Sequence, residues 1–383
     1  MSCKCDFNGE GGEMIVIDTA NHISALAAKM ARPKVIAAYP ITPQTTIVER
    51  LAEYVEKGEL DAEFIRVESE HSAMTACIAA EACGVRTFTA TSSHGLLLMH
   101  EMLHWAGLAR LPVVMVNVNR AIGPGWNIWS DANDSMAQRD TGWLHFYCSS
   151  NQEVFDTIIQ AYKIAENEEI MLPAMISYDG FILSHTSMPV EVPSQKEIDE
   201  FLPPFKPAWN IIDETITHGN IIEPFNYARI RYDMMISMEK AKKIIEEVGE
   251  EFGKKFSRYY GLVDEYKCDD ADYVIVAMAS IASEAKFAVD RLRSRGEKVG
   301  VANLRTHRPL PFEKLKYDKI IVIERALSPG LGGIVYNEIK GKVKEAYGFI
   351  AGIGGMDVSY KDIEKMYELA KKGKEGFYPF EVS

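Results

Sequence analysis

Residues 39–46 read YPITPQTT, between the apolar run 35–38 and a helical pattern with apolar side chains at positions 47, 51 and 54. The prolines at 40 and 43 hold the backbone extended, so a helix cannot begin before Gln44. We therefore predict a rigid turn from a buried strand into a helix, with the Thr42 hydroxyl at the carboxyl end of that strand. Ligands bind at this edge in open α/β sheets. A simpler interpretation is that Thr42 only caps the following helix.

Strand patterns and helix patterns alternate on both sides of this turn. The expected strands are 35–38, 64–67, 87–91, 113–118, 144–147 and 174–177, and the expected helices between them include 72–82, 96–108 and 153–165. Such alternation predicts a parallel sheet that is covered by helices on both faces.

A second α/β unit is expected from about residue 272. Its predicted strands are 273–278, 299–304, 319–323 and 348–353, and its predicted helices are 283–295, 334–344 and 363–371. A proline-rich connection at 201–226 and a charged helix at 231–259 separate it from the first unit. We therefore divide the chain into three regions, at 13–200, 201–265 and 266–383.

The composition limits the partners and the compartment. The 383 residues carry a formal net charge of −13, which argues against nucleic acid or an anionic membrane as the main partner. No run of about 18 apolar residues occurs, and the first residues lack the apolar core of a signal peptide. We expect a cytoplasmic protein.

Neither the cysteines nor the glycine-rich turns predict a metal or phosphate site. No closely spaced cysteine run suits an iron–sulfur cluster. Cys3 and Cys5 could bind a metal together with another chain, although such a terminal pair is more often part of a solvated tail. The glycine-rich segments 330–333 and 352–355 lack the lysine of a nucleotide-binding loop, so we interpret them as tight turns.

Two glutamates lie where the second strand meets an alanine-rich helix. Residues 66–73 read RVESEHSA, and the small side chains that follow permit close packing around Glu68 and Glu70. A carboxylate in crowded surroundings is paired or keeps its proton, because burial disfavours the charged form. In the alternative interpretation, both glutamates only stabilise the helix N-terminus through its dipole.

An arginine comes directly after another apolar strand. Arg120 follows VVMVNVN at 113–119, and a guanidinium at a strand's carboxyl end suits a planar carboxylate. The alternative is a structural ion pair with one of three aspartates in the next loop. These are Asp131, Asp134 and Asp140. Because Thr42, Glu70 and Arg120 follow three strands of one parallel sheet, we expect them along one edge.

Long motifs extend in a familiar order through nearly the whole chain. They are AAYPITPQTTI at 37–47, FIRVESEHSA at 64–73, TFTATSSHGLLLMHE at 87–101, LPVVMVNVNRAI at 111–122, QRDTGW at 138–143, LPAMISYDGFILSH at 172–185, NLRTHRPLP at 303–311 and AGIGGMDVS at 351–359. By these motifs the chain closely resembles the alpha subunit of pyruvate:ferredoxin oxidoreductase (pyruvate synthase), of the multi-subunit 2-oxoacid:ferredoxin oxidoreductase family.

The resemblance implies a fold, a reaction and residue roles. The region 13–200 would be a parallel-sheet pyrimidine-binding domain for thiamine diphosphate, and 266–383 a transketolase C-terminal-like α/β domain. Pyruvate and coenzyme A would yield acetyl-CoA, carbon dioxide and reduced ferredoxin, or the reverse. Glu70 would be the catalytic and cofactor-binding residue, hydrogen-bonded to N1′ of the thiamine aminopyrimidine. Thr42 and Arg120 would hold the carboxylate and carbonyl of the 2-oxo acid.

The resemblance also implies that this chain is incomplete as an enzyme. It lacks the Gly-Asp-Gly motif, followed by Asn-Asn, that binds the diphosphate magnesium in this superfamily, and it lacks cluster-binding cysteines. A beta subunit would supply the magnesium and diphosphate half of the site. Gamma and delta-type subunits would serve assembly and carry the iron–sulfur clusters, and the chain alone would be inactive.

Three residues depart from the expected family pattern, so the resemblance does not decide which 2-oxo acid is the substrate. His94 stands where glutamine is common, and the loop after Arg120 carries Trp126 and Trp129. Branched-chain or aromatic 2-oxo acids therefore remain alternatives to pyruvate, whereas 2-oxoglutarate is less expected. Two other classes are also open: a non-catalytic scaffold subunit of such a complex, and a stand-alone small-molecule binding module.

Overall fold

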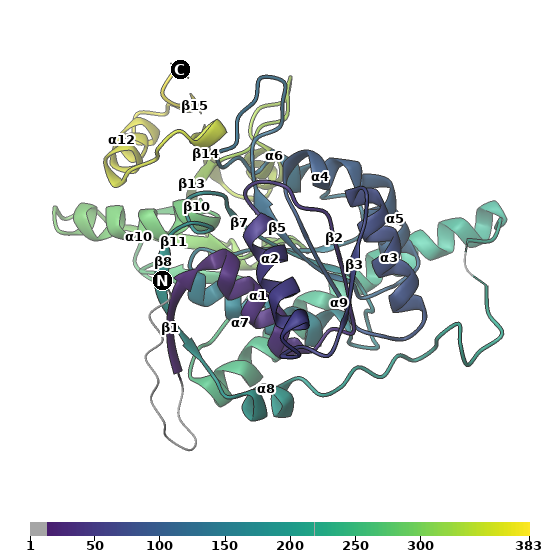
Figure 1. Ribbon diagram of the computed structural model, residues 1–383. Helices are drawn as coiled ribbons and strands as arrows, with labels where there is room; N and C mark the ends of the chain where they lie inside the picture. The colour runs from purple at the N-terminus through teal and green to yellow at the C-terminus, as the bar shows by residue number, and fades with distance from the viewer. Residues whose placement is uncertain (1–13, 218) are drawn as a thin grey trace.

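The computed structural model describes residues 14–217 and 219–383 and has the predicted α/β class, with two seven-stranded sheets flanked by helices (Figure 1). Cys3 and Cys5 lie outside the described residues. Within the described ranges, no helix is both long and apolar enough to cross a lipid bilayer.

The first sheet is built from the N-terminal part of the chain and one later strand. Its strands are β2 (Val35–Ala38), β3 (Glu63–Arg66), β4 (Thr87–Thr91), β5 (Val114–Asn119), β6 (Leu144–Tyr147), β7 (Ala174–Asp179) and β12 (Thr306–Arg308). They lie in the order β12-β6-β7-β5-β4-β2-β3, and only β12 runs antiparallel to its neighbour. The six predicted strands of this region are confirmed, and β2, β4 and β6 have the predicted bounds.

Helices cover both faces of this sheet. They are α1 (Ala20–Ala31), α2 (Thr45–Glu56), α3 (Glu70–Ala82), α4 (Ser93–Leu98), α5 (His100–Leu108), α6 (Asn133–Met136), α7 (Asn151–Ala165), α8 (Gln195–Phe201) and α9 (Pro224–Phe256). Successive strand side chains enter opposite cores: Ile36 packs with residues of α1, α2, α7 and α9, and Ala37 with residues of α3, α4 and α5. The single helix predicted over 96–108 is wrong, because the chain forms α4 and α5 on either side of Met99.

The second sheet forms the core of the C-terminal unit. Its strands are β9 (Val263–Tyr266), β10 (Tyr273–Ala277), β11 (Val299–Leu304), β13 (Lys319–Glu324), β14 (Glu345–Ile350), β15 (Gly376–Phe377) and β16 (Glu381–Val382), and its helices are α10 (Ala279–Arg293), α11 (Ile334–Ile339) and α12 (Tyr360–Ala370). The order is β16-β15-β14-β13-β10-β11-β9. Helices α10 and α12 cover one face, and α11 covers the other.

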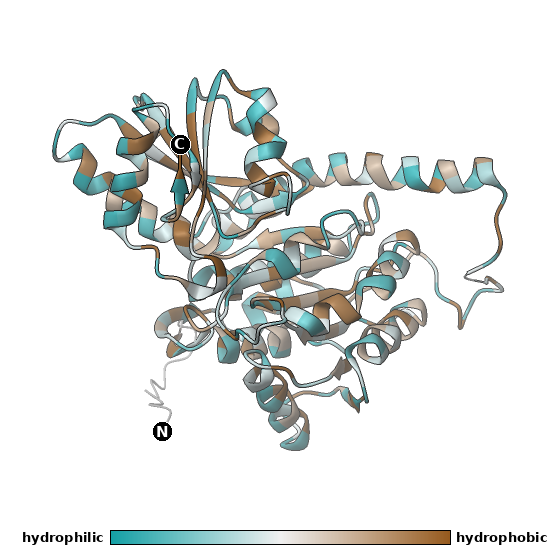
Figure 2. Ribbon diagram, turned by 90° about the horizontal axis from the view of Figure 1, so that it is seen from above, coloured by the Kyte–Doolittle hydropathy of each residue, from teal (hydrophilic) through white to brown (hydrophobic). Residues whose placement is uncertain are grey.

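Two elements were not expected in the form observed. Strand β1 (Met14–Thr19) pairs antiparallel with β8 (Ser187–Val192) in a separate two-stranded sheet. The charged helix predicted from residue 231 begins at Pro224, and its first ten residues bury no side chain. This N-terminal part of α9 extends away from the rest of the molecule in both views (Figures 1 and 2).

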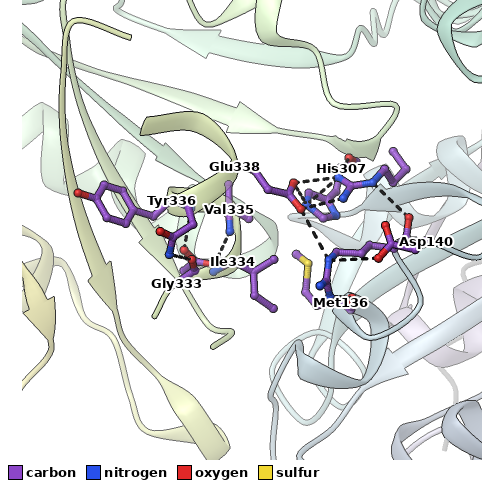
Figure 3. A network of polar contacts seen from close by, with 12 residues as sticks. Met136, Asp140, His307, Gly333, Ile334, Val335, Tyr336 and Glu338 are labelled. Carbon is purple, nitrogen blue, oxygen red and sulfur yellow. Dashed lines mark hydrogen bonds and ion pairs between the residues drawn. The ribbon is translucent and has the colours of Figure 1, made fainter. Parts of the chain in front are cut away.

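A charged cluster joins the second unit to the strand that it contributes to the first sheet. The Glu338 carboxylate of α11 accepts two hydrogen bonds from Arg308, at 2.8 and 2.9 Å, and its Oε2 lies 3.0 Å from His307 Nε2 (Figure 3). Arg139 Nε lies 3.7 Å from the same carboxylate. Burial acts to raise the pKa of Glu338, but the hydrogen bonds with His307 and Arg308 outweigh it and hold the pKa well below its usual range.

We expect Glu338→Gln to lower the free energy of unfolding at neutral pH by about 1–3 kcal/mol, because it removes a charged acceptor from this cluster. A carboxylate whose pKa is depressed in the folded state stabilises that state above its unfolded pKa, near 4.5 for glutamate, and the gain declines as the pH falls. Urea unfolding between neutral pH and about pH 4 should therefore show the difference from wild type shrinking. Glu368→Gln, at a half-exposed surface carboxylate, is the control. A difference that does not change with pH would contradict this account.

Candidate functional site

The three predicted site residues follow parallel strands at one edge of the first sheet. Strands β2, β3, β4 and β5 run in the same direction, so their carboxyl ends lie side by side. Thr42 follows β2, Glu70 follows β3 and begins α3, and Arg120 follows β5. Ser93 Oγ, just beyond β4, donates to the Ala121 carbonyl at 2.6 Å and so ties the β4 end to the segment after β5.

Arg120 is buried without a carboxylate partner. The residue is only 4% exposed, and its Nη1 donates a hydrogen bond to the Thr42 carbonyl at 2.7 Å. Its Nε donates to the Asn127 carbonyl at 3.4 Å. Burial lowers the pKa of Arg120, which stays charged at neutral pH. No carboxylate among the described residues forms an ion pair with this guanidinium, so it retains donors for an anion.

The predicted alternative, a structural pair with a loop aspartate, is wrong for the guanidinium. Asp134 does bind Arg120, but through the backbone: its Oδ2 accepts a hydrogen bond from the Arg120 N–H at 3.1 Å. Asp131 accepts from the backbone of Asn133. Asp140 lies beside Arg139, at 3.8 Å.

Asp134 instead joins several backbone segments. Its carboxylate also accepts hydrogen bonds from the Ser93 N–H (2.9 Å), the Ser135 N–H (2.7 Å), Asn117 Nδ2 (3.3 Å) and Asn119 Nδ2 (2.7 Å). Burial raises the pKa of Asp134 to about 6, although these donors favour the anion. The carboxylate thereby fixes the start of α4, the end of β5 and the start of α6 relative to one another.

The turn that contains Thr42 is held by buried amides. Asn21 donates to the Pro43 carbonyl at 2.7 Å, and Gln44 donates to the carbonyls of Tyr39 and Ala90. Gln44, not Thr42, is the N-cap residue of α2, and no side chain caps that helix. The interpretation of Thr42 as a helix cap is therefore wrong, and its exposed side chain forms no hydrogen bond to any described residue.

Glu70 lies in a space that a glycine leaves open. The residue is 6% exposed, and its carboxylate has no hydrogen-bond partner in the described part of the chain. A Cβ at Gly95 would stand 2.6 Å from Glu70 Oε1 and 2.6 Å from Thr91 Oγ1, so only glycine fits there. Thr91 Oγ1 is buried and has no partner within the described ranges. The Glu70 carboxylate and the Thr91 hydroxyl thus pack against the Gly95 backbone, and a ligand with polar atoms would satisfy them.

Glu68 and Glu70 differ in their surroundings. Ser69 caps α3 through the Ser72 N–H, and the exposed Glu68 accepts a hydrogen bond from the Ser72 hydroxyl. That hydrogen bond lowers the pKa of Glu68. Ser69 therefore caps the helix, while Glu70, the acidic residue of its first turn, also suits the helix dipole, so that alternative stays open.

Two of the residues that depart from the family pattern, His94 and Trp126, lie close to each other, and Trp126 lies close to Arg120. His94 Nε2 accepts from the Gly123 N–H at 2.8 Å, and the His94 ring meets the Trp126 ring edge-on at 5.4 Å between centroids. The Trp126 ring lies 5.9 Å from the Arg120 guanidinium carbon and is 79% exposed. His94 therefore supports the loop that carries Trp126 beside Arg120.

The glycine-rich segments are turns, as predicted. Gly330 and Gly332 have φ of +84° and +101°, and Gly352, Gly354 and Gly355 also have positive φ. At the first turn, the Glu324 carboxylate accepts the N–H groups of three residues at the start of α11. These are Ile334, Val335 and Tyr336. Glu324 fills the position that a phosphate would take in a nucleotide-binding loop.

Several structural roles in the site were not predicted. Asn21 and Gln44 hold the turn, Asp134 organises the edge, and Gly95 makes room for Glu70. Only Gly95 could have been suspected from the sequence, because a glycine shortly after a strand often marks a close approach of backbone and side chain. The roles of the others depend on contacts between distant segments.

Two family models match this chain. "Pyruvate flavodoxin/ferredoxin oxidoreductase, thiamine diP-bdg" matches residues 26–250, and "Pyruvate:ferredoxin oxidoreductase core domain II" matches residues 271–363. Both matches agree with the resemblance seen in the motifs.

Curated relatives align over almost the full chain. Pyruvate synthase subunit PorA of Methanothermobacter thermautotrophicus is 46% identical over 361 residues, which cover 92% of this chain and 94% of the relative. Ketoisovalerate oxidoreductase subunit VorA of Pyrococcus horikoshii is also 46% identical, over 368 residues that cover 92% and 93%. Overall identity therefore does not distinguish the two named activities.

Two solved structures share the fold. A 2-oxoglutarate:ferredoxin oxidoreductase from Magnetococcus marinus superimposes with a TM-score of 0.73 at 18% identity, over 92% of this chain and 65% of that chain. A split-gene transketolase superimposes with a TM-score of 0.54 at 12% identity, over 92% and 97%. At such identities the likeness concerns the fold alone.

We expect Asp134→Asn to lower the free energy of unfolding by about 3 kcal/mol, because an amide NH₂ would face backbone donors that the carboxylate now accepts. Thermal unfolding of the chain measures this. Asp140→Asn is the matched control, since it makes the same change in the same loop at a side chain 77% exposed. Equal stability of the two variants would contradict the role assigned to Asp134.

Proposed function

This chain belongs to the pyruvate flavodoxin/ferredoxin oxidoreductase family, and we propose that it is the alpha subunit of a thiamine-diphosphate-dependent 2-oxoacid:ferredoxin oxidoreductase that acts on pyruvate. The reaction is the oxidative decarboxylation of pyruvate with coenzyme A to acetyl-CoA, carbon dioxide and reduced ferredoxin, or the reverse synthesis of pyruvate. Resemblance to PorA relatives supports pyruvate, and the VorA relatives make a branched-chain 2-oxo acid the alternative to be tested.

The buried Arg120 guanidinium is the main structural evidence that the substrate carries a carboxylate. A buried arginine without a carboxylate partner is costly unless an anion completes its hydrogen bonds. The carboxylate of a 2-oxo acid matches the planar guanidinium in shape and charge. We propose that Arg120 binds this carboxylate and that the exposed Thr42 hydroxyl donates to the substrate from the end of β2, on the other side of β4.

Glu70 suits the aminopyrimidine of thiamine diphosphate. The carboxyl group is buried, has no hydrogen-bond partner among the residues described, and occupies the place that a side chain at position 95 would take. We propose that Glu70 holds a proton shared with N1′ of the aminopyrimidine, as general acid–base catalysis there requires. When bound, the cofactor supplies the carbanion chemistry that releases carbon dioxide. The protein's part is to orient the substrate, to hold that proton and to exclude water.

The remaining parts of the enzyme are proposed to lie on other chains. We propose that a beta subunit binds magnesium and the diphosphate, because their sequence motif is absent here. Gamma and delta-type subunits would serve assembly and hold the iron–sulfur clusters that pass electrons to ferredoxin. We also propose cytoplasmic location and the domain division 13–200, 201–265 and 266–383. Strand β12 of the third region pairs with β6 in the first sheet.

Substitution of Arg120 tests the substrate class. In the complete complex, we expect Arg120→Ala to lower kcat/KM for pyruvate about 100-fold, since charge-assisted hydrogen bonds of up to about 3 kcal/mol are lost. Arg32→Ala, at an arginine 59% exposed near the opposite end of β2, should leave kcat/KM unchanged. An Arg120 variant as active as wild type would exclude the proposed carboxylate site.

A substrate panel decides between the named relatives. The co-purified complex is assayed anaerobically with coenzyme A, thiamine diphosphate and a viologen acceptor, against pyruvate and 3-methyl-2-oxobutanoate. We expect the higher kcat/KM with pyruvate. A higher kcat/KM with 3-methyl-2-oxobutanoate would replace pyruvate as the proposed substrate and leave the proposed mechanism unchanged. Discrete partner chains are expected to co-purify, whereas a monomer would favour a stand-alone binding module.

A further inference from the structure

The loop that follows Arg120 rests on the second unit of the protein. Asn127 Nδ2 donates to the Gly354 carbonyl at 2.8 Å, and the Gly354 N–H donates to Asp131 Oδ2 at 3.3 Å. These residues are more than 200 positions apart in the sequence. Gly354 belongs to the glycine-rich turn 352–355, to which the proposed function assigns no role.

Missing side chains allow the glycine turn to approach the loop. A Cβ on Gly355 would stand 2.2 Å from the Trp129 Cβ, and a Cβ on Gly354 would stand 2.8 Å from Asn127 Nδ2. Gly354 and Gly355 also have φ of +64° and +82°, values that other residues rarely adopt. Both the conformation and the close contact therefore require glycine.

The base of the same loop is fixed to the second unit by a buried ion pair. Arg325, at the end of β13, lies 2.8 Å from Asp179 Oδ1, and both residues are almost fully buried. The Ser130 hydroxyl donates to Asp179 at 2.6 Å, and the Ala132 N–H donates to the Arg325 carbonyl at 3.0 Å. Met136 and Ala132 belong to the apolar core beneath the second sheet.

The residues that touch the turn also hold Arg120. The Asn127 carbonyl accepts from Arg120 Nε, and the Trp129 carbonyl accepts from the Ala121 N–H at 2.9 Å. Asn127 Oδ1 in turn accepts from the Trp129 N–H at 2.8 Å. Displacing Asn127 would therefore move one acceptor of the guanidinium, and displacing Trp129 would move the carbonyl that holds the backbone just after Arg120.

We propose that the glycine turn 352–355 positions Arg120 and so sets the affinity of the site for the carboxylate of its substrate. This inference rests on the proposed function for the identity of that carboxylate. Gly354 and Gly355 act through Asn127 and Trp129, so they are positioning residues. The second unit thereby contributes to substrate binding without touching the substrate.

The test compares two glycine variants in the complete complex. Gly355→Ala introduces a methyl group against Trp129, and Gly330→Ala is its control. Gly330 lies in the same unit with a φ of +84°, and a Cβ there meets nothing within 4 Å. Both variants carry the same backbone strain, and only the first disturbs the loop. We expect Gly355→Ala to raise KM for pyruvate about tenfold with kcat within about twofold, and Gly330→Ala to leave both unchanged.

A variant on the other side of the contact separates positioning from general damage. Asn127→Ala should also raise KM. Because both changes disturb the seating of one loop on one glycine turn, the double variant should raise KM less than the product of the single effects. Independent effects, an unchanged KM in Gly355→Ala, or an equal change in Gly330→Ala would overturn the proposal.

Hydrogen exchange provides a readout that does not depend on activity. We expect faster amide exchange across residues 120–131 in Gly355→Ala than in Gly330→Ala or wild type. A wild-type complex inactive with every 2-oxo acid would overturn the proposed function, and exchange would still decide whether the turn positions the loop. Unchanged exchange in Gly355→Ala would overturn the inference itself.

Discussion

Five hydrogen bonds converge on the Asp134 carboxylate, and the geometry of the sheet's carboxyl edge depends on them. These backbone and amide donors satisfy the buried carboxylate, which forms no hydrogen bond with the Arg120 guanidinium. This carboxylate fixes the Arg120 backbone, while the Arg120 guanidinium donates to two backbone carbonyls and forms no ion pair with a carboxylate of the described residues. This separation lets a protein keep a buried cation for a ligand and still fold, because the cost of burial is spread over neutral donors.

The second unit takes part in the same arrangement. Its Arg325 pairs with Asp179 at the end of β7, and its glycine turn supports the loop after Arg120. At the other glycine-rich turn, 330–333, the Glu324 carboxylate of the same unit accepts the N–H groups at the start of α11. Two segments that look alike in sequence thus differ in what they contact: one closes on its own carboxylate, and the other holds a loop of the first unit.

Much of the fold was predictable from local patterns. Buried parallel strands are short apolar runs, so β2, β4 and β6 could be located from the sequence. The rule that parallel strands end at one edge predicted Thr42, Glu70 and Arg120 along that edge, and the structure shows a contact between Arg120 and Thr42. Strand β12 has three residues and no periodicity, so its pairing with β6 gave no signal. The division of α4 from α5, the role of Asp134 and the contact of Gly355 with Trp129 depend on tertiary packing, which periodicity does not report.

We propose that this chain holds the substrate and aminopyrimidine half of a shared thiamine diphosphate site. The most direct test is anaerobic viologen reduction, dependent on pyruvate, coenzyme A and thiamine diphosphate, by complexes that contain wild-type chain, Glu70→Gln or Glu68→Gln. The account predicts that Glu70→Gln assembles normally but loses reduction, while the exposed Glu68→Gln retains it. Full activity of Glu70→Gln, or no reduction with any 2-oxo acid by a complete cluster-bearing wild-type complex, would contradict the account and favour a scaffold role.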